Sequence, residues 1–215
     1  MKIFLDTAET DVIRKNFVTG LVDGLTTNPT LIMKSGRNPE EVYEEIKEIG
    51  VPDISMEVVG TGEEMVAEGR RLKKKFGDCC TIKVPCTRGG LAACRVLAEE
   101  GIRVNVTLIF SQTQAILASK AGAAYVSPFV GRVDDNSFGG ICLVKDIVSV
   151  FKEHFVTTQV LAASVRNVRD VGRLFEHGAE IVTMPPGVFD KMYNHVLTDA
   201  GLEQFDKDWN EVQGR

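Results

Sequence analysis

The chain has 215 residues, of which 44% are hydrophobic and 26% are charged, with a formal net charge of −5. This acidic balance argues against a general binder of nucleic acids or of anionic membranes, and no apolar run approaches the roughly 20 residues that span a bilayer. Five cysteines without a CxxC pair favour reduced core thiols over a disulfide framework or a zinc site. The N-terminal apolar run is too short for a signal peptide, so we expect a cytoplasmic protein.

Short apolar strands alternate with helices along the whole chain. We predict strands at residues 2–5, 21–25, 54–58, 79–85, 103–106, 123–126, 158–161 and 180–184. We predict helices at residues 7–17, 39–49, 63–76, 89–100, 111–121, 141–155, 168–177, 188–195 and 202–212. The pattern indicates an α/β fold, a single-domain (β/α)8 TIM barrel over residues 1–215 with an extra C-terminal helix at about 198–215. A doubly wound open sheet is the alternative, but neither GxGxxG nor GxxxxGK[ST] follows a strand.

The predicted strand at 79–85 carries a lysine, Lys83, in its middle. A continuous apolar run bounded by turn signals is typical of a strand that is buried on both faces. Lysine is rarely buried there unless it reaches water or pairs with a carboxylate. The other interpretation is that burial disfavours the ammonium, so that some free amine is available near neutral pH to attack a carbonyl.

Polar side chains stand where the predicted strands end, which is where (β/α)8 barrels hold their chemistry. They are Asp6, Asn28, Glu57, Lys83, Asn105, Thr107, Ser127, Arg132, Ser164 and Arg166. Taken singly, Asp6, Ser127 or Ser164 are equally well explained as helix caps or turn formers. Together the set suits a Schiff-base enzyme, in which the lysine forms an iminium with a ketone and carboxylates move protons. Amides would hold hydroxyls, and the two arginines would bind a phosphate.

The three histidines, His154, His177 and His195, lie on predicted helices, away from the strand ends. Their position disfavours a metal-assisted aldolase and a Ser/Cys–His–Asp hydrolase, because both need a histidine at the site. We therefore expect no metal ion at the site.

Six motifs in order resemble the transaldolase family, and more closely its short subfamily, which also contains fructose-6-phosphate aldolase. They are FLDTA at 4–8, GLTTNPT at 24–30, IKVP at 82–85, NVTLIF at 105–110, SPFVGR at 127–132 and AASVRN at 162–167. The resemblance covers essentially the whole chain. It implies a cofactor-free enzyme of the pentose phosphate pathway that forms a Schiff base at Lys83 and acts on small sugar phosphates.

The resemblance also implies a role for each of the other site residues. Asp6 would be the acid/base, and Glu57 and Thr107 would position a catalytic water. The dihydroxyacetone moiety would be held by Asn28, Asn105 and Ser127, and the phosphate by Arg132, Ser164 and Arg166, the last standing where some relatives carry lysine. Members of the subfamily look like homo-oligomers, decamers or pentamers, whose C-terminal helix packs on a neighbouring subunit. A stripe of Phe205 and Trp209 is compatible with such packing or with packing on the chain's own barrel.

Two positions bear on the choice between the two activities of the subfamily. Aldolases that release free dihydroxyacetone resemble this sequence but carry glutamine at Glu57 and tyrosine at Phe129. A carboxylate exchanges protons with water where an amide does not, and phenylalanine would keep the pocket drier. We therefore predict a transaldolase. A fructose-6-phosphate aldolase is the alternative, and a non-catalytic sugar-phosphate-binding barrel is the alternative from another class.

Overall fold

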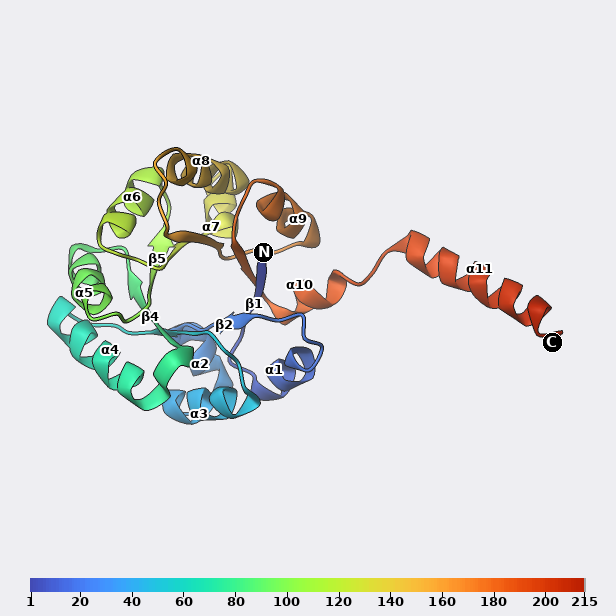
Figure 1. The fold of residues 1–215 in the computed structure, drawn as a ribbon, viewed down its shortest axis with the longest axis horizontal. Helices are drawn as coiled ribbons and strands as arrows, with labels where there is room; N and C mark the ends of the chain where they lie inside the picture. Colours follow the sequence, from blue (N-terminus) through green and yellow to red (C-terminus); the bar gives the residue numbers. More distant parts are fainter. Residues whose placement is uncertain (215) are drawn as a thin grey trace.

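Eight parallel strands close into a barrel in sequence order, with β1 paired to β8 (Figure 1). The computed structural model describes residues 1–214. The strands are β1 (Lys2–Asp6), β2 (Gly24–Thr26), β3 (Ile54–Glu57), β4 (Cys80–Pro85), β5 (Val104–Ile109), β6 (Tyr125–Pro128), β7 (Gln159–Ala162) and β8 (Ile181–Met184). The predicted (β/α)8 barrel is confirmed, and the open-sheet alternative is wrong.

Helices surround the barrel, as Figure 1 shows. They are α1 (Thr10–Phe17), α2 (Pro29–Ser35), α3 (Pro39–Ile49), α4 (Gly62–Phe76), α5 (Arg88–Glu99), α6 (Gln112–Lys120), α7 (Val130–Asp135), α8 (Gly140–Glu153), α9 (Val168–Glu176), α10 (Pro186–Lys191) and α11 (Val196–Val212), with a 3-10 turn η1 (Gly77–Cys79) before β4. Side-chain caps begin many of them. Thr61, for example, forms a reciprocal capping box with Glu64 at the start of α4.

Two short helices, α2 and α7, were not predicted from the sequence, and both follow strands whose ends carry site residues. The signal for α2 was present, because Asn28 accepts a hydrogen bond from the backbone of Leu31 and Pro29 occupies the first helical turn. α7 has no side-chain cap at its N-cap residue, Phe129, so no capping pattern in the sequence predicts this helix. The last helix starts at Val196, before the predicted 198 or 202, because His195 caps it.

Side chains alternate between two packed layers along the strands. One layer lies between strands and helices and includes Leu5, Leu25, Ile82 and Val106. The other lies inside the barrel, where Phe4, Tyr125, Leu161, Ala163 and Ile181 form a separate apolar cluster. The inside-facing positions nearer the carboxyl ends of the strands are polar, and Lys83 is among them. The barrel interior therefore holds polar groups toward the carboxyl ends of the strands, next to this apolar cluster.

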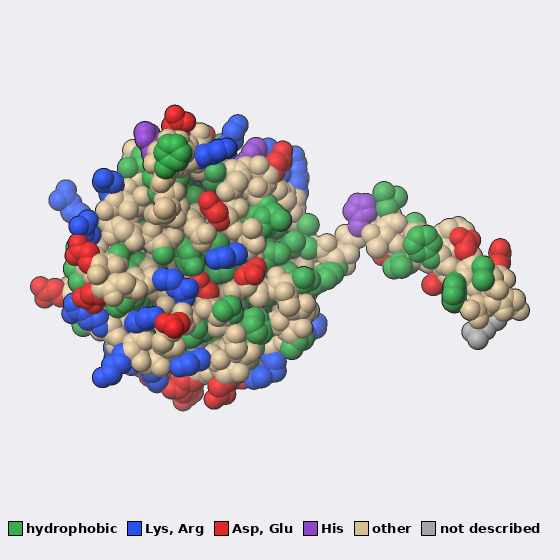
Figure 2. All heavy atoms as spheres, in the orientation of Figure 1, with side chains coloured by type: hydrophobic (Ala, Val, Ile, Leu, Met, Phe, Trp, Pro, Cys, Tyr) green, Lys and Arg blue, Asp and Glu red, His purple; other side chains and the backbone are tan. Residues whose placement is uncertain are grey.

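The C-terminal helix α11 projects away from the barrel and makes no part of its core (Figure 1). Phe205 and Trp209 are 70% and 63% exposed, so they do not pack on their own barrel. Hydrophobic and acidic side chains are both visible on this helix in Figure 2. Residue 215, at the end of the predicted helix, lies outside the described residues. None of the helices within 1–214 is long and apolar enough to cross a membrane.

Candidate active site

Lys83 lies inside the barrel toward the carboxyl end of β4, and only 4% of the residue is exposed. The register places it beside Glu57 of β3, and its Nζ lies 2.9 Å from Glu57 Oε2. The same Nζ donates to the backbone carbonyl of Thr27 at 2.9 Å. The lysine therefore pairs with a carboxylate, as one interpretation of the sequence required. It also lines a cavity inside the barrel at the carboxyl ends of the strands, which we call the central cavity.

Asp6, at the end of β1, is held by a chain of two threonine hydroxyls. Thr26 Oγ1 donates to Asp6 Oδ1 at 2.7 Å, and the hydroxyls of Thr26 and Thr183 lie 2.7 Å apart. Because Thr26 gives its single proton to Asp6, Thr183 must be the donor in the second bond. Burial raises the pKa of the Asp6 carboxyl above its ordinary value, although the Thr26 hydrogen bond and the charge of Lys83 act in the opposite direction. A carboxyl of this kind is suited to acid/base work closer to neutral pH.

Thr107 carries a buried hydroxyl that has no hydrogen-bond partner among residues 1–214. It lies on β5 at a β-bulge. Between two paired positions, β5 spans three residues while β6 spans two. Leu108, the residue after it, takes a left-handed φ of 59°, which is rare for a leucine. An unpaired buried hydroxyl is costly unless a ligand or water completes it. This one lines the central cavity.

Asn105 and Ser127 form a buried pair on neighbouring strands. Ser127 Oγ donates to Asn105 Oδ1 at 2.7 Å, and Asn105 Nδ2 donates to Ser55 Oγ at 3.1 Å. Asn105 does not line the central cavity, whereas Ser127 does. The structure therefore places the Asn105 amide behind Ser127, where it orients that hydroxyl.

Two arginines stand near the mouth of the cavity in different states. The Arg132 guanidinium lies over the ring of Phe129, with its carbon 4.8 Å from the ring centroid. Arg166 pairs through both of its terminal nitrogens with Asp135, at the end of α7. Its hydrogen bonds hold the pKa of the Asp135 carboxyl below the ordinary value. Arg166 does not line the cavity in this arrangement.

The loop after β7 comes very close to the start of α7. Ser164 takes a left-handed φ of 59°, and its carbonyl accepts from the backbone N–H of Gly131 at 3.0 Å. A Cβ on Gly131 would lie 2.4 Å from that carbonyl oxygen and 2.6 Å from Arg166 Nε. Glycine is therefore required here, and the strained Ser164 backbone holds its side chain at the cavity.

The central cavity has a volume of about 100 Å³ and gathers most of the predicted site residues. Those that line it are Asp6, Asn28, Lys83, Thr107, Ser127, Phe129, Arg132 and Ser164. Glu57, Asn105 and Arg166 do not line it, although Glu57 contacts Lys83 directly. Asn28 also caps α2 through its Oδ1, and its Nδ2 donates no hydrogen bond to residues 1–214.

Sequence reasoning missed Thr26 and Thr183, which both line the cavity. Thr26 is the last residue of β2, and Thr183 comes one residue before the end of β8. Both are polar residues at or next to the end of a strand, so the strand-end pattern that indicates the other site residues applies to them as well. Within the described chain, no three His, Cys, Asp or Glu side chains lie close enough together to hold a metal ion.

The fold and the site define a class: a (β/α)8-barrel protein with a buried lysine and carboxylates at the carboxyl ends of its strands. The family model described as Transaldolase/Fructose-6-phosphate aldolase matches residues 3–215, and the chain belongs to this family. It is an enzyme of the aldolase and transferase type that the family contains.

Curated relatives match over nearly their full length. A protein of Nitrosopumilus maritimus (strain SCM1), named "Probable transaldolase", is 51% identical over 99% of this chain and 96% of its own length. A protein of Caulobacter vibrioides (strain NA1000 / CB15N), with the same name, is 52% identical over 97% of this chain and 96% of its own. A third, from Caulobacter sp. (strain K31), is also named "Probable transaldolase" and is 53% identical over the same shares.

Proposed function

We propose that this protein is a transaldolase that forms a Schiff base at Lys83. It would transfer a dihydroxyacetone unit from a ketose phosphate to an aldose phosphate in the pentose phosphate pathway. The donor would be sedoheptulose 7-phosphate or fructose 6-phosphate, and the acceptor glyceraldehyde 3-phosphate or erythrose 4-phosphate. The observation that carries the proposal is the buried Lys83 amine, 2.9 Å from the Glu57 carboxylate, in the same cavity as the unpaired hydroxyl of Thr107.

The first step joins Lys83 to the ketose. The amine, after giving a proton to a neighbouring carboxylate, adds to the C2 carbonyl, and loss of the former carbonyl oxygen as water leaves a cationic iminium. Glu57 supplies the proton acceptor beside the nitrogen. The Thr107 hydroxyl has both its proton and its lone pairs available for the departing water.

The second step breaks the bond between C3 and C4. Asp6 takes the proton of the C4 hydroxyl, C4 becomes the carbonyl of the leaving aldose phosphate, and the electron pair of the broken bond moves into the iminium to give a neutral enamine. Its raised pKa suits Asp6 to hold this proton and return it when an acceptor aldehyde arrives. Addition to that aldehyde and hydrolysis of the new iminium by water restore the free lysine.

The phosphate of each sugar would bind at the mouth of the cavity. The cavity is too small for a whole ketose phosphate, since drug-sized ligands fill about 300–1,000 Å³. The phosphate end must then lie outside it, beside Arg132 and Ser164. Arg166 would join the phosphate after release from Asp135, since guanidinium forks bind phosphate and carboxylate oxygens alike.

Transfer is favoured over release of free dihydroxyacetone by Phe129 and Glu57. Phe129 packs edge-to-face on Phe110, with ring centroids 5.8 Å apart, and lines the cavity with an apolar face. A drier pocket protects the enamine from a proton donor until an acceptor arrives. The names of the curated relatives agree with this choice.

The protein would also form a homo-oligomer, a decamer or pentamer, with α11 packed on a neighbouring subunit. α11 is not buried anywhere along its described length and carries exposed Phe205 and Trp209. Light scattering on the intact chain and on a Phe205→Ser/Trp209→Ser variant tests this: the variant should give a smaller particle. An unchanged mass would contradict the role of α11.

Borohydride trapping with fructose 6-phosphate, followed by peptide mass mapping, tests the proposed function. A dihydroxyacetone adduct on Lys83 that disappears when erythrose 4-phosphate is added supports a transaldolase. Steady release of dihydroxyacetone without an acceptor would identify the aldolase instead. An absence of any adduct would leave a sugar-phosphate-binding barrel.

A further inference from the structure

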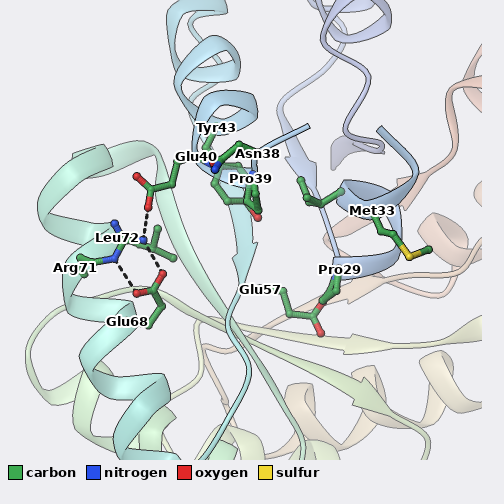
Figure 3. Close-up of a pocket in the computed structure, with 11 residues that line it drawn as sticks. Pro29, Met33, Asn38, Pro39, Glu40, Tyr43, Glu57, Glu68, Arg71 and Leu72 are labelled. Atoms are coloured by element: carbon green, nitrogen blue, oxygen red, sulfur yellow. Dashed lines mark hydrogen bonds and ion pairs between the residues drawn. The ribbon is translucent and has the colours of Figure 1, made fainter. Parts of the chain in front are cut away.

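A second cavity reaches the reacting pair from the side of the barrel. It lies between α2, α3 and α4 and has a volume of about 470 Å³ (Figure 3). Glu57 and Pro29 lie together at one end of it, and Arg71, Glu68 and Leu72 of α4 lie opposite. We call it the side cavity.

The two cavities meet at the ion pair between Lys83 and Glu57. Glu57 lines the side cavity and not the central one, whereas Lys83 lines the central cavity and not the side one. Their side chains are joined by the 2.9 Å contact from Nζ to Oε2. The Glu57 side chain is 14% exposed, against 6% for Lys83. The carboxylate therefore has contact with solvent that does not pass through the substrate's mouth.

Among residues 1–214, the lining of the side cavity offers no unpaired cation to bind a phosphate. Three carboxylates, Glu40, Glu57 and Glu68, face one guanidinium, that of Arg71, which bridges Glu40 and Glu68. Hydrogen bonds from Lys75 and Arg71 lower the pKa of Glu40, and one from Arg71 lowers that of Glu68, so both carboxyls are ionised at neutral pH. The one guanidinium in the lining is therefore already paired and leaves no free cation there for a phosphate, whereas a water needs only on the order of 10–15 Å³ of this space.

We propose that the side cavity is the route by which the water and the protons of the imine chemistry exchange with bulk solvent. This inference rests on the proposed function. Imine formation releases one water and hydrolysis consumes one, yet a bound ketose phosphate fills the small central cavity and its phosphate covers the mouth. Glu57, with its carboxylate between the lysine and the side cavity, passes the proton, and water leaves and enters beside it.

The route makes a prediction about oxygen exchange. The water that leaves carries the former C2 oxygen of the ketose, and hydrolysis returns a water oxygen to C2. In water enriched in oxygen-18, each cycle of imine formation and hydrolysis labels C2 only if the released water has escaped. Filling the side cavity should retain that water and slow labelling without changing how much imine forms.

The experiment fills the side cavity from two opposite walls, with Met33→Trp on α2 and Glu68→Trp on α4. Met33 is 71% exposed and the Glu68 side chain 40% exposed, so neither change enlarges a side chain within the core. Val96→Trp, in the groove between α4 and α5, is the control for adding a tryptophan, and Glu68→Gln is the control for removing the charge. Each protein is incubated with fructose 6-phosphate in labelled water without an acceptor. C2 labelling is followed by mass spectrometry, with non-enzymatic exchange subtracted, and borohydride trapping measures the adduct on Lys83.

We expect both cavity-filling variants to trap as much adduct as the wild type and to label C2 about tenfold more slowly, with both controls unchanged. Undiminished labelling in the filled variants would overturn the inference while leaving the proposed function intact. A parallel loss of adduct and labelling would also overturn it, because the side cavity is assigned no part in binding the ketose. No adduct in the wild type would instead remove the proposed function.

Discussion

The two ends of the barrel interior differ in how completely their buried polar groups are hydrogen-bonded. At the amino end, both oxygens of buried Asp53 accept hydrogen bonds, from Thr81 at 2.7 Å and from Tyr125 at 2.6 Å, and Arg103 Nη1 lies 3.6 Å away. At the carboxyl end, the hydroxyl of Thr107 has no partner among residues 1–214, and the backbone of Ser164 is strained.

The difference distinguishes the polar groups that stabilise the barrel from those that serve its activity. A fully paired buried network stabilises the fold, whereas unpaired groups and left-handed φ angles lower stability and persist where a ligand completes them. We therefore expect substrate or water to supply the missing hydrogen-bond partner at the carboxyl end. Substitutions at the two ends should separate activity from stability.

The largest effect is expected at Lys83. Lys83→Met keeps the length of the side chain but removes the nucleophile, so activity should fall by at least about 10⁴-fold. The fold should persist, because the Glu57 carboxylate left behind reaches the side cavity and its solvent. Coupled assays of aldose phosphate formation and circular dichroism measure the two results. Full activity in this variant would remove the Schiff-base proposal.

Asp6→Asn should lower activity by about 10²–10⁴-fold and yet raise stability at neutral pH. Burial raises the pKa of Asp6, so the folded state binds this proton more tightly than the unfolded chain does. The stability linked to it is fully present below the ordinary pKa of 3.8 and is lost as pH rises through the folded-state value. Asparagine removes that loss and still accepts from Thr26.

Thermal unfolding of Asp6→Asn and the wild type between pH 4 and pH 8 tests this sign. The melting temperature of the variant should exceed that of the wild type at neutral pH, and the gap should narrow toward acid. Asp53→Asn is the counterpart at the amino end and should lower the melting temperature, since Thr81 and Tyr125 then compete for one oxygen. A melting temperature of Asp6→Asn below that of the wild type at neutral pH would contradict the prediction.

Much of this organisation was predictable from the sequence because it depends on short-range patterns. Alternating apolar strands and helices define the barrel, and the rule that site residues follow strands located Asp6, Lys83 and Ser127. What the sequence did not reveal is how deeply each site side chain is buried and which cavity it faces. Asn105 turns out to lie behind Ser127, and Glu57 faces a side cavity, because both depend on how neighbouring strands are staggered.

The β5 bulge is a second feature beyond the reach of sequence reasoning. A left-handed φ is usually signalled by glycine or asparagine. Here Leu108 in β5 has such a φ, and so does Ser164 in the loop after β7. At Ser164 the conformation is accompanied by a tertiary contact, because its carbonyl accepts a hydrogen bond from the backbone N–H of Gly131. Sequence patterns locate residues at strand ends, while strain of this kind becomes visible only in the folded barrel.

A threonine-to-valine substitution at each end of the barrel tests the same difference in hydrogen bonding. Thr107→Val removes the unpaired hydroxyl, so the free energy of unfolding should be unchanged or higher, while activity should fall by about tenfold to a hundredfold. Thr81→Val removes a donor to buried Asp53 and should destabilise the fold by about 1–3 kcal/mol with little change in kcat. Urea unfolding and initial rates separate the two. Equal stability losses would show that the Thr107 hydroxyl is paired in solution by a structural partner.

The smallest effect is expected at the mouth of the central cavity, where Asp135 forms an ion pair with Arg166. Asp135→Asn frees the guanidinium for phosphate, so KM for a ketose phosphate should fall by about two- to fivefold, the range that an exposed ion pair is worth, with kcat unchanged. Stability should change little for the same reason. Asp134→Asn is the matched control: it removes the same charge one residue away, and its amide oxygen still accepts from the backbone of Gly140. A similar fall in KM in both variants would mean that the net charge of α7, and not the release of Arg166, sets the affinity for phosphate.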